Sequence, residues 1–367
     1  MNRMWRADRM RRTSALREVW LAVPGDLTTA TGGYAYARRL LAALPDTGWR
    51  PRLIGLSPRF PFPTAQDVDA ARNALAAVPA GAPVIVDGLA FGAMPRATLE
   101  GLACRLVALV HHPLALETGL PREAAESLHA SERAALNMAT AVIASSAHTA
   151  QALIRDYAVP AGRIRLAWPG IDPAPRIRPS DKPRARPSLL LGVGAVTPRK
   201  GFDTLVRALS TMADLSWSCL IVGSLDRDAA TAASLRDLIT SHRLGERIIL
   251  AGEVSDRELD RAYREATAFV LPSRHEGYGM VFAEALTHAL PIVACRAGAV
   301  PQTVPADAGI LVPVDDDKAL ASALRTLLSD DPSRQRMADA AWRHGQTLPR
   351  WSDTARAVAN MLEGITA

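Results

Sequence analysis

Residues 274 to 286 read RHEGYGMVFAEAL and follow directly after the apolar run AFVLPS, which begins at Ala268. This pattern predicts a buried strand, a glycine-bearing turn and then a helix. Gly277 and Gly279 would let another group approach the backbone closely. Backbone N–H groups at the start of a helix can receive an anion, and here they belong to Tyr278, Gly279, Met280 and Val281. The stretch therefore predicts a phosphate-binding site.

Two glutamates bracket this turn, Glu276 before the helix and Glu284 inside it. A carboxylate beside a diphosphate is repulsive, so we expect each glutamate to bind hydroxyl groups instead, one on a sugar and one on a ribose. Taken singly, Glu276 could equally cap the helix and Glu284 could be a solvated helix residue. The combination of the two favours a ligand site.

A second strand, tight loop and helix are predicted by VGAVTPRKGFDTLVRAL, which begins at Val193. Arg199 and Lys200 stand at the end of this loop, where two cations could neutralise a leaving diphosphate. At ~4 Å one such pair is worth roughly 4 kcal/mol at an effective dielectric of 20. The alternative is a pair of solvent-facing basic residues before a helix.

These motifs resemble glycosyltransferase family 4, a retaining group with the two-domain GT-B fold. The resemblance rests on the E-x7-E element of Glu276 and Glu284, and on the flanking stretches AGEVSDRELDRAYREATAFVLPS, ALPIVACRAGAVPQTV and GILVPVDD. It implies that Glu276 contacts the donor sugar and Glu284 the ribose. Lys200 matches the family's Lys-Gly pair. The position where many members carry an arginine is Ala195, which leaves Arg199 as the candidate for the missing charge.

The first half of the chain carries weaker signals. Gly32 and Gly33 precede a predicted helix and fit the family's N-terminal glycine loop, which lies near the donor phosphates and the acceptor. His111 and His112 follow the predicted strand RLVALV, and the carboxyl ends of strands are where open α/β sheets bind ligands. His111 matches the family's active-site histidine. His112 is interpreted as structural, and Asp87 as either a cleft residue or a turn cap.

Aliphatic runs and segments of helical spacing alternate through the chain twice, which is typical of parallel α/β sheets. With the resemblance, this predicts two Rossmann-like domains with parallel sheets facing across a cleft. We expect an acceptor-side domain over residues 15–175, a proline-rich linker over 176–188 and a donor domain over 189–348. Residues 349–367 are expected to form a helix that packs toward the N-terminal domain.

Composition excludes several classes of protein. The 367 residues are 49% hydrophobic, and no run approaches the ~18 apolar residues that span a bilayer. The N-terminus lacks the apolar stretch of a signal peptide, so we expect a cytoplasmic protein. Cys104, Cys219 and Cys295 are widely spaced, which predicts buried thiols rather than a disulfide framework or a zinc site.

The net charge of +6 owes much to six arginines within the first 17 residues, at positions 3, 6, 9, 11, 12 and 17. This cluster is either a solvated tail or a contact to the anionic inner face of the plasma membrane. The arginines are not interleaved with aromatic residues and no nucleic-acid-binding module is visible, so a nucleic-acid partner is not expected.

The resemblance therefore implies a retaining hexosyltransferase. Its co-substrate would be a nucleotide diphosphate sugar, and its acceptor a lipid or a cell-envelope polysaccharide intermediate. The resemblance implies no required metal and no other cofactor. Two rivals share the fold, a sugar-nucleotide epimerase and a catalytically weak nucleotide-sugar-binding scaffold. A nicotinamide dehydrogenase is disfavoured, because neither glycine loop has the G-x-G-x-x-G spacing with an acidic residue ~20 positions later.

Overall fold

The computed structural model describes residues 17–175 and 187–367. Within these ranges the strands form two six-stranded, all-parallel sheets. The first has the order β2-β1-β3-β4-β5-β6 and comprises β1 (Arg17–Pro24), β2 (Trp49–Leu56), β3 (Pro83–Asp87), β4 (Arg105–Val110), β5 (Ala141–Ala144) and β6 (Ile164–Leu166). The second has the order β12-β11-β10-β7-β8-β9 and comprises β7 (Ser188–Val193), β8 (Trp217–Val222), β9 (Ile248–Gly252), β10 (Ala268–Leu271), β11 (Ile292–Cys295) and β12 (Gly309–Val312).

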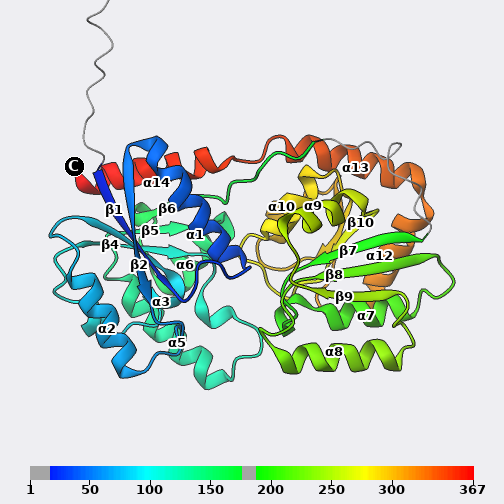
Figure 1. The fold of residues 1–367 in the computed structure, drawn as a ribbon, viewed down its shortest axis with the longest axis horizontal. Coiled ribbons are helices and arrows are strands. Elements are labelled where there is room, and N and C mark those ends of the chain that lie inside the picture. The colour runs from blue at the N-terminus through cyan, green and yellow to red at the C-terminus, as the bar shows by residue number, and fades with distance from the viewer. Residues whose placement is uncertain (1–16, 176–186) are drawn as a thin grey trace, which may run out of the picture.

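Helices connect the strands in both halves (Figure 1). The first half contains α1 (Gly32–Ala43), α2 (Ala65–Ala76), α3 (Gly88–Phe91), α4 (Arg96–Leu99), α5 (Arg122–Leu136) and α6 (Ala147–Tyr157). The second contains α7 (Phe202–Ser210), α8 (Ala229–Ser241), α9 (Asp256–Glu265), α10 (Met280–Thr287), α11 (Val300–Thr303), α12 (Asp317–Ser329) and α13 (Asp331–Gly345). The two Rossmann-like units predicted from the sequence are confirmed.

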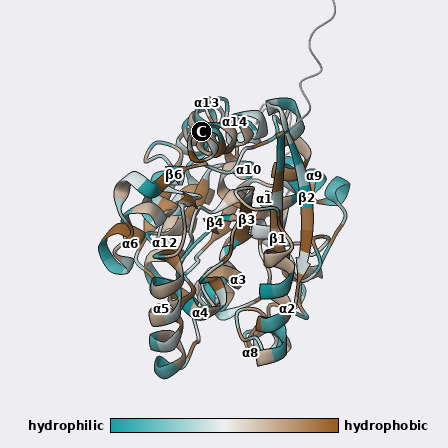
Figure 2. Ribbon diagram, turned by 90° about the vertical axis from the view of Figure 1, so that its left-hand side faces the viewer, coloured by the Kyte–Doolittle hydropathy of each residue, from teal (hydrophilic) through white to brown (hydrophobic). Residues whose placement is uncertain are grey.

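Both faces of the first sheet are buried, as expected for a parallel sheet. Along β4, Leu106, Ala108 and Val110 pack into one core, while Val107 and Leu109 pack into another on the opposite face. In Figure 2 the central strands of this sheet are brown, for hydrophobic residues, and the surrounding helices carry teal stretches of hydrophilic residues. A third core fills the second domain. Cys104, Cys219 and Cys295 are free and buried in these cores.

The last helix, α14 (Trp351–Thr366), lies on the N-terminal domain although it follows the second sheet in sequence (Figure 1). Val358 and Leu362 are fully buried in the core that also contains Leu40 of α1, and burying each such side chain contributes about 1.5–3 kcal/mol. The chain passes between the two domains twice, first after Gly170 and again before α14. The two passages lie close together, since a Cβ added at Gly170 would lie 2.3 Å from Trp351 N. The second crossing segment therefore packs tightly against the first.

Two expected segments lie partly or wholly outside the described residues. The basic cluster is one of these segments, because its arginines at positions 3–12 are not described. The proposed linker is the other, because residues 176–186 are not described. In the ranges that are described, no helix is long and apolar enough to cross a membrane.

Candidate active site

The loop between β10 and α10 is the centre of the site. Gly279 has a φ of +83° and precedes Met280, the first residue of α10, and no side chain caps this helix. The first N–H groups of a helix have no partner within it, so this end of α10 is open to an acceptor from outside. Thr303 Oγ1 donates to the carbonyl oxygen of Tyr278 at 2.6 Å and holds the turn.

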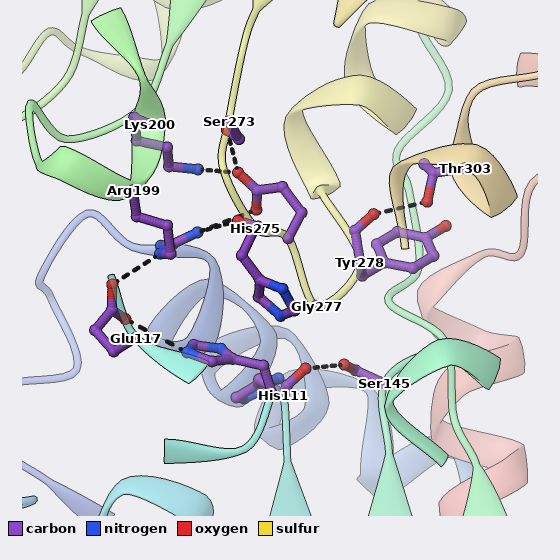
Figure 3. A network of polar contacts seen from close by, with 12 residues as sticks. His111, Glu117, Ser145, Arg199, Lys200, Ser273, His275, Gly277, Tyr278 and Thr303 are labelled. Carbon is purple, nitrogen blue, oxygen red and sulfur yellow. Dashed lines mark hydrogen bonds and ion pairs between the residues drawn. The ribbon is translucent and has the colours of Figure 1, made fainter. Parts of the chain in front are cut away.

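Lys200, Arg199 and Glu276 form a buried charged cluster, and Figure 3 shows the two cations side by side. Lys200 Nζ donates to Glu276 Oε1 at 2.7 Å, and Ser273 Oγ donates to the same oxygen at 2.7 Å. Arg199 Nη1 lies 3.4 Å from Glu276 Oε2. Burial alone would raise the pKa of Glu276, but the charges of Lys200 and Arg199 outweigh it and lower this pKa to about 2. Glu276 is therefore ionised.

Arg199 also reaches across to the N-terminal domain. Its Nε donates to Glu117 Oε1 at 3.0 Å, and its Nη1 donates to the carbonyl oxygen of His275 at 3.0 Å. Glu117 Oε2 lies 3.4 Å from His112 Nε2. Burial raises the pKa of Glu117, but the hydrogen bond from His112 and the charge of Arg199 lower it to about 2. Carboxylates from both domains thus hold the two cations.

His111 lies just after β4, with its ring edge against Tyr36 at a centroid distance of 5.1 Å. His111 Nε2 is buried without a hydrogen-bond partner in the described chain, and it lies 3.8 Å from Asp87 Oδ2. Burial, and then the charge of His112, lower the pKa of His111 to about 4. Its imidazole is therefore neutral at pH 7.

Asp87 is both a cap and a neighbour of the site, the two interpretations considered from the sequence. Its side chain accepts from Leu89 N at 2.9 Å and caps α3, and it also faces His111. Burial raises the pKa of Asp87 to about 6.

The N-terminal glycines lie against the same site. A Cβ added at Gly33 would lie 3.4 Å from His111 Cδ2, and one added at Gly32 would lie 3.7 Å from Met280 Sδ. Gly277 is tighter still, since a Cβ there would lie 2.2 Å from the carbonyl oxygen of His111. Gly277 therefore lets the two domains meet at backbone distance just before α10, whereas a Cβ at Gly32 or Gly33 would make ordinary van der Waals contact with a side chain.

Glu284 lies one helical turn deeper in α10 and is separate from the charged cluster. It accepts a hydrogen bond from Tyr263 Oη at 2.8 Å, and Tyr263 Oη lies 3.4 Å from the carbonyl oxygen of Val281. Burial raises the pKa of Glu284 to about 7. Glu284 is thus neither a solvated residue nor part of the ion pairs around Glu276.

The structure brings nearly all the predicted residues to the loops at the carboxyl ends of β1, β4, β7 and β10. No motif of the sequence indicates three members of the cluster, Glu117, Ser273 and His275. His112, interpreted as structural from the sequence, faces Glu117 with its ring. The signal for Glu117 was available, because it is an acidic residue in the loop that carries the two histidines. Among the described residues, no group of His, Cys, Asp or Glu side chains is arranged to hold a metal ion.

Two family models match the chain. The model described as "Glycosyltransferase Family 4" matches residues 30–175, and the model described as "Glycosyl transferases group 1" matches residues 174–344.

Among curated proteins, the D-inositol 3-phosphate glycosyltransferase 1 of Catenulispora acidiphila is 33% identical over 56% of this chain and 52% of its own length. The D-inositol 3-phosphate glycosyltransferase of Corynebacterium efficiens is 29% identical over 58% of this chain and 54% of its own. The chain spans about half the length of these relatives.

Solved structures share the fold over nearly the whole chain. Sucrose-phosphate synthase from Thermosynechococcus elongatus superposes with a TM-score of 0.78 at 22% identity, covering 95% of this chain and 98% of that one. Anabaena HepE in complex with UDP-glucose superposes with a TM-score of 0.72 at 16% identity, covering 94% and 99%. Both comparisons support two Rossmann-like domains in the GT-B arrangement.

Proposed function

The chain belongs to glycosyltransferase family 4, and from this premise we propose that it moves a hexosyl group from a nucleotide diphosphate sugar to a hydroxyl acceptor. One observation carries the proposal. The open N-terminal end of α10, the cations Arg199 and Lys200 and the carboxylate Glu276 lie together where the two domains meet. A diphosphate sugar needs this combination of anion-binding amides, cations and an acceptor for sugar hydroxyls.

Each part of the donor has a proposed partner. The diphosphate lies against the backbone amides of residues 278–281 and receives charge from Arg199 and Lys200. Glu276 accepts hydrogen bonds from the hydroxyls of the sugar, and Glu284 from those of the ribose. The neutral His111 orients the sugar ring. Charge stabilisation of the leaving diphosphate then supplies most of the catalysis, because charge develops there in the transition state.

The proposed reaction retains the configuration of the anomeric carbon. The bond from that carbon to the diphosphate oxygen breaks as the acceptor oxygen attacks from the same face, and the leaving diphosphate takes the proton of the acceptor hydroxyl. The reaction then needs no nucleophile from the protein and depends on positioning and charge stabilisation. Proton NMR of the first product formed tests this: the anomeric coupling constant of the donor should be preserved, and an inverted product would refute it.

Donor turnover tests the function itself. Purified protein is incubated with uridine, guanosine and adenosine diphosphate sugars, and released nucleoside diphosphate is measured with and without candidate acceptors. We expect release from one donor, and its loss in Lys200→Ala and Glu276→Ala. If nucleotide sugar binds but is neither hydrolysed nor transferred, the chain is a binding scaffold. If the sugar is released in an isomeric form instead, it is an epimerase.

We propose a lipid or cell-envelope polysaccharide intermediate as the acceptor, met by a cytoplasmic enzyme at the inner face of the plasma membrane. The basic cluster of the first 17 residues supports this, since several arginines near a surface favour anionic lipid. Deleting residues 1 to 14 should weaken binding to phosphatidylserine vesicles in a sedimentation assay. Equal binding by the full chain and the shortened chain would remove the argument.

A further inference from the structure

The guanidinium group of Arg199 is held at two of its three nitrogens. Nε donates to Glu117 Oε1 and Nη1 donates to the carbonyl oxygen of His275, each at 3.0 Å. Within residues 17–175 and 187–367, Nη2 donates no hydrogen bond to the protein. A guanidinium group is planar and rigid, so fixing Nε and Nη1 also fixes the direction of the N–H groups on Nη2.

The residue that fixes Nε comes from the other domain. Glu117 lies between β4 and α5 of the N-terminal domain, while Arg199 lies in the loop between β7 and α7 of the C-terminal domain (Figure 3). His148 N donates to Gln302 Oε1 at 3.0 Å across the same boundary. Arg199 can therefore take this orientation only while the two domains are in contact.

The pair is more protected than an ordinary surface ion pair. Only 19% of the Arg199 side chain and 42% of the Glu117 side chain are exposed. The exposed pair of Arg122 and Glu126 on α5, for comparison, has side chains that are 92% and 65% exposed. Exposed pairs contribute little, whereas a half-buried carboxylate that fixes a guanidinium group determines where its charge points.

The loop between β7 and α7 offers few cations for a donor diphosphate. Position 195, where the resemblance places an arginine beside the phosphates, is an alanine with no charge to offer. Lys200 is occupied by Glu276 at 2.7 Å. Arg199 Nη2 is thus a charged donor at this loop that has no hydrogen-bond acceptor among the described residues.

We propose that Glu117 is a positioning residue, which aims Arg199 Nη2 at the donor diphosphate and thereby lets Arg199 replace the charge missing at Ala195. The inference rests on the proposed function. It adds that the cation set for the leaving group is completed by the acceptor-side domain. The contribution of Arg199 to stabilising the leaving group is therefore complete only when both domains enclose the donor.

A double-mutant cycle tests the inference. The kcat and KM for the preferred donor are measured for the unaltered protein, Glu117→Gln, Arg199→Ala and the double variant, with Glu126→Gln as a matched control on the exposed pair. Arg199→Ala should lower kcat/KM by about a hundredfold, the effect of losing one donor to a developing charge. Glu117→Gln should lower it by about tenfold, mainly through kcat, because Arg199 remains but is misaligned.

The double variant decides between positioning and a merely structural role. If Glu117 acts through Arg199, Glu117→Gln should change kcat/KM by less than about twofold once Arg199 is alanine. Glu117→Asp should recover part of the loss, and the melting temperature should stay near that of Glu126→Gln.

A loss that persists in the Arg199→Ala background, or Glu117→Gln turnover equal to that of the unaltered protein, would overturn the inference alone. Failure of the unaltered protein to turn over any donor would instead overturn the proposed function on which it rests.

Discussion

Replacing Gly277 by alanine is the sharpest single perturbation of the domain contact. The added Cβ would lie 2.2 Å from the carbonyl oxygen of His111 and 3.0 Å from its carbonyl carbon. A carbon and an oxygen approach no closer than ~3.3 Å, so the loop before α10 and the loop after β4 must separate by roughly 1 Å. Both contact atoms belong to backbone, which cannot rotate away as a side chain can.

This separation should affect catalysis more than folding. Overpacking costs typically about 1–3 kcal/mol, which a domain of this size can tolerate. A displacement of about 1 Å at a reacting centre, however, can cost on the order of a hundredfold in rate. Gly277→Ala should therefore melt within a few degrees of the unaltered protein while its donor turnover falls by about a hundredfold.

The assay is initial-rate release of nucleoside diphosphate, with thermal unfolding followed by circular dichroism on the same preparations. Gly245→Ala is the matched control, because a Cβ at Gly245 would meet nothing within 4 Å. Turnover by Gly277→Ala equal to that of Gly245→Ala would refute the claim that the two loops meet at backbone distance during catalysis.

The pKa of Glu276 is about 2 in the folded chain and roughly 4.3 in the unfolded chain. The ion pair with Lys200 therefore stabilises the fold fully above about pH 4.3, and this stabilisation is lost as the pH falls toward 2. Lys200→Ala should therefore lower the free energy of unfolding in urea by about 3–5 kcal/mol at neutral pH, with a gap that narrows in acid; a constant gap would contradict this. The pKa of Glu284 is raised to about 7, so ionising it to bind ribose becomes easier as pH rises. Calorimetric affinity for the nucleoside diphosphate should then increase between about pH 6 and pH 8, and Glu284→Gln should remove the trend. Turnover should be unchanged by EDTA, because Arg199 and Lys200 meet the charge of the diphosphate; a loss restored by Mg²⁺ would show that a metal ion is required.

Much of the fold was readable because buried parallel strands are continuous apolar runs. RLVALV and AFVLPS contain β4 and β10, and both strands are fully or almost fully buried. The edge strands β2 and β6 were not identified. β2 contains Arg50 and Arg52, which face solvent, and β6 has only three residues. Edge strands bury fewer side chains, so their sequences carry less of the apolar signal.

The site, like the fold, has features that local sequence motifs predict and contacts that they do not. Glycine and charge patterns along the chain predicted the loops that meet at α10, because each motif is local. The position of Glu117 in the loop of the two histidines is visible in the sequence, but its contact with Arg199, 82 positions away in the other domain, is not a local pattern. The engagement of Lys200 with Glu276 was also not predicted, since a motif gives the identity of its charged residues but not their partners in the absence of donor.

We expect a donor diphosphate to lie between the N-terminal end of α10 and the cations of the loop after β7. Crystals grown with UDP, GDP and ADP in turn test it most directly. For the nucleotide that binds, the phosphate oxygens should lie within hydrogen-bond distance of the amides of residues 278–281, with Lys200 and Arg199 turned toward them. A nucleotide bound with its phosphates elsewhere, and with Lys200 still paired to Glu276, would contradict it.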